Sequence, residues 1–430
     1  MITLVKGASI LGGEAADLWI EDGAFIAPAG RADETVDADG LVALPGLVDL
    51  HTHLREPGYE QSETVLTGTR AAAAGGYTAV FAMANTLPVQ DTAGVVEQVA
   101  ALGERAGYAT VRPIGAVTAG LRGERLAEIG AMASSRARVR VFSDDGMCVA
   151  DPLLMRRALE YVTTFDGVVA QHAQDPRLTE GAQMNEGERS ARLGLAGWPA
   201  VAEESIIARD VLLAEHVGAR LHVCHLSTAG SVEVVRWAKA RGVQVTAEVT
   251  PHHLLLTEEL AESYDPRYKV NPPLRTREDV EAVRAGLADG TIDIVATDHA
   301  PHPAEAKECA WAEAANGMVG LESALSVVQQ TMVETGLLDW RDVARVMSTT
   351  PAAIGRLGGY AEPFGIGAPA HLALVDPAAR RTFGHDDLRG RSVNSPYLGL
   401  ALPGRIVHVW HGGRRTVAGA ALVEALEVAS

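Results

Sequence analysis

Several residue types are scarce in this chain, and each shortage narrows what the chain can be. Only three of its 430 residues are cysteines, namely Cys148, Cys224 and Cys309. Their odd number and the lack of a CxxC spacing argue against a disulfide framework, so we expect reduced thiols. Aromatic residues make up only 5% of the chain. The core must therefore be built mainly from Ala, Val, Leu and Ile.

Long apolar runs and an excess of positive charge are also missing. No stretch approaches the ~20 apolar residues of a membrane span, and the N-terminal MITLVKGASILGG lacks the features of a signal peptide. We therefore expect a cytoplasmic protein without membrane contact. The formal net charge is −18, with 37 basic against 55 acidic residues. This balance argues against nucleic acid as a partner, and an anionic substrate would need a locally positive site.

What the chain does have is length and two β-rich ends. Its 430 residues, 47% of them hydrophobic, fit a barrel with a small appendage better than three lobes. Residues 1–44 contain short strand-like segments with a hairpin turn at EDG, and residues 356–430 contain the similar segments AHLALVDPAARRTF and RIVHVWHGGRRTVAG. Because chain termini often lie close together, we expect both ends to form one small β-sandwich domain.

The middle of the chain, residues 45–355, alternates short apolar runs with longer segments of helical character. This alternation indicates repeated βα units and a parallel sheet. There are eight such runs: LVALPGLVDLH, YTAVFAMANT, ATVRPIGAVT, RVRVFSDDG, GVVAQHA, ARLHVCHLS, VQVTAEVTPHH and TIDIVATDHAPH. Eight strands close a (β/α)8 TIM barrel. A doubly wound open sheet is the alternative, but it would not readily bring side chains from eight strands to one point.

Polar residues follow the apolar part of almost every run, at the strand ends where barrel enzymes carry their active sites. His51 and His53 are two residues apart, so on a strand they project to the same side and can bind one cation. Alone, this pair fits ordinary hydrogen-bonded histidines equally well. His172, His225 and Asp298 bring three further ligands to the same rim. Imidazole together with carboxylate suits zinc.

Five ligands exceed what one four-coordinate zinc ion needs, so two metal ions fit better. Two cations about 3.5–4 Å apart require a bridging anion, and the fourth run supplies Asp144 and Asp145. Adjacent residues of an extended chain point to opposite faces, so only one of the two can bridge. We expect the other to be a turn or capping residue. Glu248 near the end of the seventh run is expected to support the site.

These residues resemble the amidohydrolase superfamily, which carries HxH after strand one, histidines after strands five and six, and an aspartate after strand eight. More narrowly, HTHLREPG, MANT, FSDDG, CHLSTAG, EVTPHHLLLT, KVNPPLR and ATDHAPH resemble the bacterial class I dihydroorotase family. The resemblance runs from Asp49 to about Thr350 and into both flanks. Seven ordered motifs make it specific.

The resemblance implies two Zn²⁺ per subunit, held by His51, His53, Asp145, His172, His225 and Asp298. Many relatives, hydantoinases included, bridge their metals with a carboxylated lysine after strand four. This chain has only four lysines, none of them near strand four, and the family that it resembles uses an aspartate there. The family's spacing to the strand-five histidine favours Asp145 over Asp144.

The substrate residues that the resemblance implies are His53, Arg55, Asn85, Asn271, His302, Asn316 and Gly317. Arg55 is expected to hold a substrate carboxylate, because guanidinium offers a bidentate fork. Two positions depart from the family pattern, since Ala84 replaces a proline and Asn316 an aromatic residue. The segment PHPAEAKECAWAEAANG after strand eight is typical of a lid.

The activity that the resemblance implies is (S)-dihydroorotate + H₂O ⇌ N-carbamoyl-L-aspartate, a step of pyrimidine synthesis, with Asp298 as the catalytic proton shuttle. It also suggests a homo-oligomer and aspartate carbamoyltransferase as a partner. One alternative is another cyclic amidase, a hydantoinase or allantoinase, against which Arg55 and the missing lysine argue. The other is a noncatalytic scaffold, a class of relatives that has lost metal ligands, whereas this chain has the whole set.

Overall fold

Eight parallel strands surround the centre of the molecule in the computed structural model, which describes residues 1–424. They form two hydrogen-bonded groups, β6-β7-β8 and β9-β10-β13-β14-β15. Parallel bridges from Gly115 to Phe142 and from Thr52 to His299 join the groups at both seams. The strands are β6 (Leu47–Thr52), β7 (Tyr77–Ala82), β8 (Thr110–Pro113), β9 (Val141–Phe142), β10 (Val168–Gln171), β13 (Leu221–Val223), β14 (Val245–Val249) and β15 (Ile294–Val295). The predicted (β/α)8 barrel is thereby confirmed.

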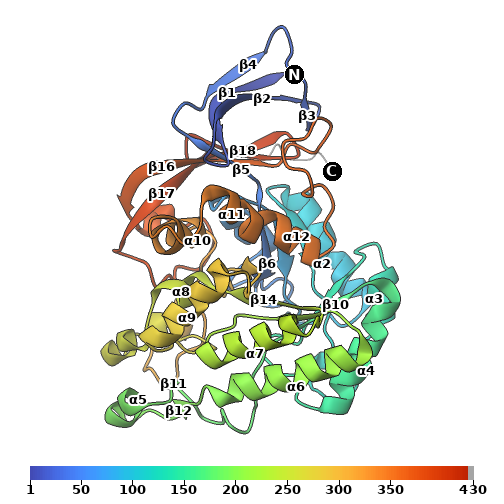
Figure 1. Ribbon diagram of the computed structural model, residues 1–430, viewed down its shortest axis with the longest axis vertical. Helices are drawn as coiled ribbons and strands as arrows, with labels where there is room; N and C mark the ends of the chain where they lie inside the picture. Colours follow the sequence, from blue (N-terminus) through green and yellow to red (C-terminus); the bar gives the residue numbers. More distant parts are fainter. Residues whose placement is uncertain (425–430) are drawn as a thin grey trace.

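Helices cover the outside of the barrel (Figure 1). They begin at residues suited to capping: Thr64, Thr228 and Thr276 accept hydrogen bonds from the first helical turn through their side chains. The α-helices are α1 (Val65–Ala74), α2 (Ala93–Ala106), α3 (Ile129–Ser134), α4 (Pro152–Val162), α5 (Glu188–Leu193), α6 (Val201–Val217), α7 (Ala229–Ala240), α8 (Pro251–Leu255), α9 (Arg277–Ala288), α10 (Ala324–Val328), α11 (Trp340–Ala344) and α12 (Thr350–Ile354). The short strands β11 (Met184–Asn185) and β12 (Gly197–Trp198) pair with each other outside the barrel.

Side chains alternate between the two faces of each strand, so the apolar residues that face the barrel interior are followed in the same phase by polar residues at the rim. Val168 and Ala170 belong to the buried interior cluster, and His172 follows in the same phase; Ile294 and Ala296 lead in the same way to Asp298. Strand β6 breaks this rule. Its register against β7 advances three residues, from Asp49 to Thr52, while β7 advances two. This β-bulge shifts the phase of β6 between Asp49 and Thr52, the stretch that contains His51 and precedes His53.

The N-terminal and C-terminal parts of the described chain form one nine-stranded sheet above the barrel (Figure 1). Its order is β19-β18-β17-β16-β5-β1-β2-β3, and β4 also pairs with β1. The first half of β1 pairs with β4 and its second half with β5. The strands are β1 (Thr3–Ile10), β2 (Ala15–Glu21), β3 (Ala24–Ile26), β4 (Glu34–Asp37), β5 (Val42–Pro45), β16 (Leu372–Thr382), β17 (Ala401–His411), β18 (Arg414–Ala418) and β19 (Ala421–Leu422).

The sheet and the barrel meet at residue 46, because β5 ends at Pro45 in the sheet and β6 begins at Leu47 in the barrel. The expected hairpin turn at EDG connects β2 to β3, and a second hairpin turn at HGG connects β17 to β18. The segment between β16 and β17 leaves the sheet and packs on the barrel. Phe383, Leu388 and Tyr397 of this segment share a buried cluster with Val319 and other barrel residues.

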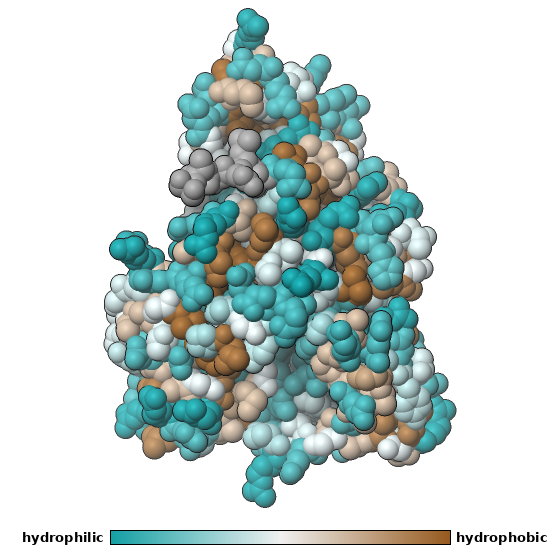
Figure 2. Space-filling view, turned by 180° about the vertical axis from the view of Figure 1, so that it is seen from behind, coloured by the Kyte–Doolittle hydropathy of each residue, from teal (hydrophilic) through white to brown (hydrophobic). Residues whose placement is uncertain are grey.

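The outer surface is mixed in character. The face in Figure 2 is largely hydrophilic, with separate hydrophobic patches and a hollow in its lower half, which belongs to the barrel. Among residues 1–424, no helix combines the length and the apolar character that crossing a membrane requires. All three cysteines are free, as expected.

Candidate metal centre and active site

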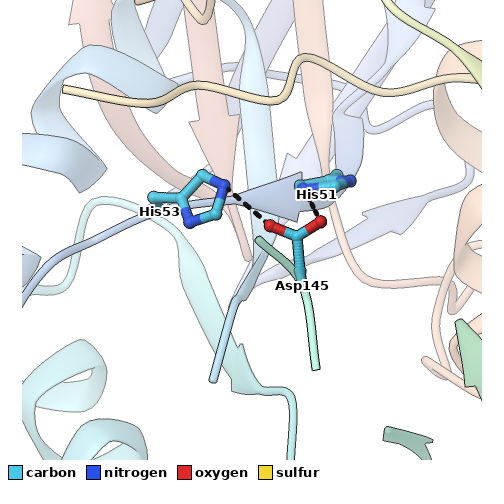
Figure 3. Close-up of side chains that lie close together, drawn as sticks. All are labelled: His51, His53 and Asp145. Atoms are coloured by element: carbon cyan, nitrogen blue, oxygen red, sulfur yellow. Dashed lines mark ion pairs between the residues drawn. The ribbon is translucent and has the colours of Figure 1, made fainter. Parts of the chain in front are cut away.

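Asp145 lies at the centre of a buried cluster of histidines. Its Oδ1 is 3.3 Å from each of three ring nitrogens: Nε2 of His51, Nδ1 of His172 and Nε2 of His225. Its Oδ2 is 3.3 Å from Nε2 of His53. Figure 3 shows the carboxylate between the rings of His51 and His53. Histidines on or just after the barrel strands β6, β10 and β13 thus meet at one carboxylate, which itself follows β9.

Asp298 completes the cluster from the end of β15. Its Oδ1 lies 3.1 Å from Nε2 of His53 and 3.4 Å from Nε2 of His51. Three residues at the rim have left-handed backbone conformations, with φ of 62° at Arg55, 30° at His225 and 47° at Asp298. Such conformations are unfavourable for residues other than glycine and are concentrated at functional sites. They turn side chains off the strand axis toward the centre.

The protonation of the histidine rings can be read from their outer partners. Nδ1 of His51 donates to Glu248 Oε1 at 2.6 Å, Nδ1 of His53 to Asn85 Oδ1 at 2.9 Å, and Nε2 of His172 to Gln174 Oε1 at 2.6 Å. With a cation bound each imidazole is neutral and has one donor nitrogen, so the other nitrogen of each ring would present a lone pair to the cluster. Nε2 of His51 is buried without a hydrogen-bond partner.

Lone pairs that face carboxylate oxygens repel unless a cation lies between them, so this donor set fits metal ions. The ligand atoms fall into two trios, His51 with His53 and Asp145, and Asp145 with His172 and His225, and the atoms of each trio lie within 4.8 Å of one another. Both trios share Asp145. The arrangement therefore offers two neighbouring cation sites with one bridging carboxylate, and its imidazole and carboxylate ligands suit zinc.

The two aspartates of the fourth run differ in their partners. Asp144 accepts hydrogen bonds from the backbone nitrogens of Val117 and Thr118, at 2.8 and 2.9 Å, and from the Thr118 hydroxyl. It thereby holds the loop after β8. Asp145 points to the histidines. Neighbouring side chains of an extended chain point to opposite sides, so Asp145 faces inward where Asp144 faces outward.

The electrostatics of the cluster favour a positive charge at its centre. Burial alone would lower the pKa of His51, but the charges of Asp145, Glu248 and Asp298 outweigh burial and raise it well above its usual range. Burial alone would raise the pKa of Asp298, but the positive charge that His51 carries when no cation is bound, together with the nearby ring of His53, lowers it to about 2. Asp298 is therefore a carboxylate at neutral pH.

A cavity of about 300 Å³ opens over the cluster. Every substrate residue expected from the sequence lines it, together with the metal-ligand candidates apart from the fully buried His51. The cavity residues are His53, Arg55, Asn85, Asp145, Gly146, His172, His225, Asn271, Asp298, Ala300, His302, Asn316 and Gly317. Arg55 donates from Nε to the Pro301 carbonyl at 3.2 Å. Its two terminal nitrogens take no part in this hydrogen bond.

His302 and Gly317 form one wall of this cavity. Nε2 of His302 lies 2.8 Å from the Asn316 carbonyl oxygen, which can only accept, so Nε2 carries the proton. Burial and the nearby charge of Arg55 lower the pKa of His302 to about 3. Its neutral ring leaves Nδ1 as an acceptor. Gly317 has φ of 136°, and a Cβ there would meet Ala300 and His302 at 2.8 and 2.9 Å, so this wall requires glycine.

Some residues around the site were not found from the sequence. Gln174 accepts from both His172 and, at 3.1 Å, Nδ2 of Asn271, so it ties a metal-ligand candidate to a substrate-residue candidate. The sequence did offer one signal for Gln174. It lies two residues after His172, so that alternation places both side chains on the same side of the chain. His222 donates from Nε2 to Glu248 at 3.0 Å. No local pattern marks His222, because its partner lies 26 residues away.

Comparison with known proteins agrees with this geometry. The family model described as Dihydro-orotase-like matches residues 40–231. The chain is 72% identical to a protein named dihydroorotase from Leifsonia xyli subsp. xyli, covering 98% of each chain, and 68% identical to one from Streptomyces coelicolor, covering 96% of this chain and 98% of that protein. The solved L-hydantoinase (dihydropyrimidinase) from Arthrobacter aurescens has the same fold, with a TM-score of 0.87 at 24% identity over 98% of this chain and 97% of that chain. By these matches, the chain belongs to the dihydroorotase family of cyclic amide hydrolases.

Proposed function

We propose that this protein binds two zinc ions at the mouth of its barrel and catalyses the reversible cyclisation of N-carbamoyl-L-aspartate to (S)-dihydroorotate in pyrimidine synthesis. One observation carries the proposal. The shared carboxylate Asp145, the ionised Asp298 and the guanidinium of Arg55 line a single cavity of about 300 Å³. Metal ligands, a proton acceptor and a binding group for a carboxylate are what hydrolysis of an acidic cyclic amide requires.

The residues that would hold the two ions are His51, His53, Asp145, His172, His225 and Asp298. When bound, zinc would polarise the substrate carbonyl and lower the pKa of water. The carboxylates of Asp145 and Asp298 together carry two negative charges against four positive charges on two Zn²⁺. The loaded site is therefore positive, which suits an anionic substrate on a protein of net charge −18.

Asp298 is the proposed proton shuttle. With a pKa of about 2 it is ionised at neutral pH, so it can accept a proton as water attacks the ring carbonyl. It then delivers this proton to the ring nitrogen as the C–N bond breaks, and N-carbamoyl-L-aspartate is formed. In the reverse direction Asp298 takes a proton from the ureido nitrogen as that nitrogen attacks the carbon of the protonated carboxyl group. Asp298 then passes this proton to the departing hydroxyl, which leaves as water.

Arg55, Asn271 and His302 are the proposed binding groups. The half-buried guanidinium of Arg55 would pair with the carboxylate that the ring bears, because guanidinium and carboxylate form strong charge-assisted hydrogen bonds. Asn271 is held through Gln174, and His302 through Asn316, so both side chains are oriented before substrate arrives. Preorganised groups of this kind lower the entropic cost of binding.

Two other functions remain as rivals. The solved hydantoinase supports the fold alone, and hydantoins lack the ring carboxylate for which Arg55 is suited. A noncatalytic scaffold would have no need of the complete set of inward-facing ligand atoms around Asp145. The cytoplasmic location, the homo-oligomer and the association with aspartate carbamoyltransferase stay predictions.

The test is a substrate panel run on purified protein with its zinc content measured by elemental analysis. We expect turnover of dihydroorotate, in both directions, and little or none of hydantoin or allantoin. Turnover of only hydantoin or allantoin would replace the proposed substrate. Protein without zinc and without turnover of any of the three would support the scaffold.

A further inference from the structure

The loop after β15, residues 301–317, carries three of the residues proposed to bind substrate, namely His302, Asn316 and Gly317. Its two ends lie side by side, because His299 and Met318 form a parallel bridge and the Ala300 nitrogen donates to the Met318 carbonyl at 2.8 Å. The loop has the cavity of about 300 Å³ on one face. A second cavity of about 620 Å³ is lined by other residues of the loop, and His302 lines both cavities. His302 therefore lies between two cavities, and hydrogen bonds hold this part of the loop.

Asn394 makes the hydrogen bonds that hold the two ends together. Its Nδ2 donates to the carbonyls of Ala300, at 3.0 Å, and Gly317, at 3.2 Å. Its Oδ1 accepts from the His302 nitrogen at 3.1 Å, and its backbone carbonyl accepts from the Val319 nitrogen at 3.2 Å. The side chain is 5% exposed. One amide thus links the first residues of the loop to its last one.

Among side chains of this length, only asparagine can make all of these hydrogen bonds. Two carbonyls need donors and one N–H needs an acceptor, and a carboxamide offers both. An aspartate in this place would turn an acceptor toward two carbonyls, which leaves buried polar groups unpaired and repelling. Ser or Ala would be too short to reach the partners.

The segment that carries Asn394 is itself fixed to the barrel. Glu322 Oε1 accepts from the nitrogens of Arg389 and Gly390, at 2.9 and 3.2 Å. Glu63 Oε1 accepts from the Arg391 nitrogen at 3.0 Å, and the Ser392 hydroxyl donates to the Ser62 carbonyl at 2.6 Å. Residues 389–394 are therefore fixed to the barrel, and Asn394 can hold the loop from this fixed segment.

The middle of the loop is held independently by two of the chain's four lysines. Nζ of Lys269 donates to the carbonyls of Trp311 and Ala312, at 2.7 and 3.2 Å. Nζ of Lys307 donates to the Pro266, Lys269 and Ala315 carbonyls, at 2.9, 3.1 and 2.7 Å. The lysines hold the middle of the loop and the Gly317 nitrogen, which donates to the Lys269 carbonyl at 3.0 Å. The two ends carry the substrate residues, and Asn394 is the side chain that bonds to both of them.

We propose that Asn394 is a positioning residue that sets His302, Asn316 and Gly317 for substrate binding by joining the two ends of the loop from the C-terminal segment. This inference rests on the proposed function for the identity of the substrate. It assigns to the C-terminal segment a role in the active site as well as in the β-sheet domain. Asn394 does not line the substrate cavity, so its effect is exerted through the loop.

The experiment compares Asn394→Asp and the milder Asn394→Ser with Ser392→Ala. The control removes one of the four hydrogen bonds that fix residues 389–394 to the barrel, while the other three and the bonds from Asn394 to the loop remain. The zinc-loaded full-length proteins are assayed for KM and kcat with dihydroorotate. Hydrogen exchange of residues 301–319 is followed by mass spectrometry without substrate.

We expect both Asn394 variants to raise KM about 10-fold, to change kcat much less, and to speed exchange of the loop about 10-fold or more. Ser392→Ala should leave KM and loop exchange near wild type. Unchanged loop exchange in a folded Asn394 variant, an unchanged KM, or an equal KM rise in Ser392→Ala would overturn the proposal. Wild-type protein that fails to turn over dihydroorotate contradicts the proposed function instead, and loop exchange then decides the positioning role alone.

Discussion

Glu248 lies directly behind His51, with its Oε1 2.6 Å from the ring Nδ1. The same oxygen accepts from the backbone nitrogen of His225 at 3.1 Å, and Oε2 accepts from His222 at 3.0 Å. One buried carboxylate therefore orients a member of each ligand trio. It also fixes the tautomer of His51 that presents Nε2 to the site.

The first prediction concerns Glu248→Gln. Glutamine has one acceptor oxygen where three donors converge, so His51 or His222 loses its partner and the ring orientation relaxes. We expect zinc affinity, measured by competition with a chromogenic chelator, to fall about 10- to 100-fold. Glu233→Gln, an exposed change on α7, is the matched control. Equal zinc affinities in the two variants would exclude the orienting role.

Asp298→Asn tests the proton shuttle. The amide keeps the shape of the side chain but does not accept a proton at neutral pH, so kcat should fall at least about 10²-fold. The melting temperature of the folded protein should stay within a few degrees of wild type. A variant that retains near-normal kcat would assign proton transfer to another group.

Arg55→Ala and Arg55→Lys test recognition of the substrate carboxylate. Loss of a charge-assisted bidentate pair should raise KM for dihydroorotate about 10- to 100-fold, and lysine should restore only part of the loss because it lacks the planar fork. The comparison substrate is hydantoin, which has no carboxylate. If any hydantoin turnover by the wild type fell by the same factor, Arg55 would be acting on the site in general.

The structure also shows how far sequence reasoning reaches. The number of barrel strands and the polar residues at their ends were predictable, because apolar runs and strand-end chemistry are local patterns. Once the family spacing was known, the alternation of side chains along a strand was enough to choose Asp145 over Asp144 as the bridging residue. These features depend on residues close together in the chain.

Features that depend on distant pairings were not predictable in this way. The β-bulge of β6, which aims His51, appears only in its register against β7. Asn394 is 92 residues from the His302 nitrogen that it binds, and residues 356–430 were expected to serve the β domain alone. No local pattern in the chain indicates that part of this segment returns to the barrel mouth.

A further prediction concerns pH and the junction of sheet and barrel. His371 stacks on Tyr360 with ring centroids 4.8 Å apart and an interplanar angle of 8°. Burial, with a smaller effect of His411, lowers the pKa of His371 to about 4, against about 6.5 in an unfolded chain. Between these values the unfolded state binds more protons. The stability that is present above pH 6.5 is therefore lost as pH falls toward 4, by up to about 1.4 kcal/mol per pH unit.

His371→Phe keeps an aromatic ring in the stack but does not titrate. We expect its melting temperature to fall less between pH 7 and pH 5 than that of the wild type. The lost hydrogen bond from the Gly412 nitrogen should lower both values alike, so the difference between the two pH values isolates protonation. An identical difference in variant and wild type would show that other groups dominate acid unfolding.

Zinc stoichiometry tests most directly the claim that Asp145 joins two cation sites. Elemental analysis of the purified wild type should give two zinc ions per chain. The double variant His172→Ala/His225→Ala, which removes one trio and leaves His51, His53 and Asp145 intact, should give one. A single zinc ion in the wild type, or the same number in both proteins, would contradict the account.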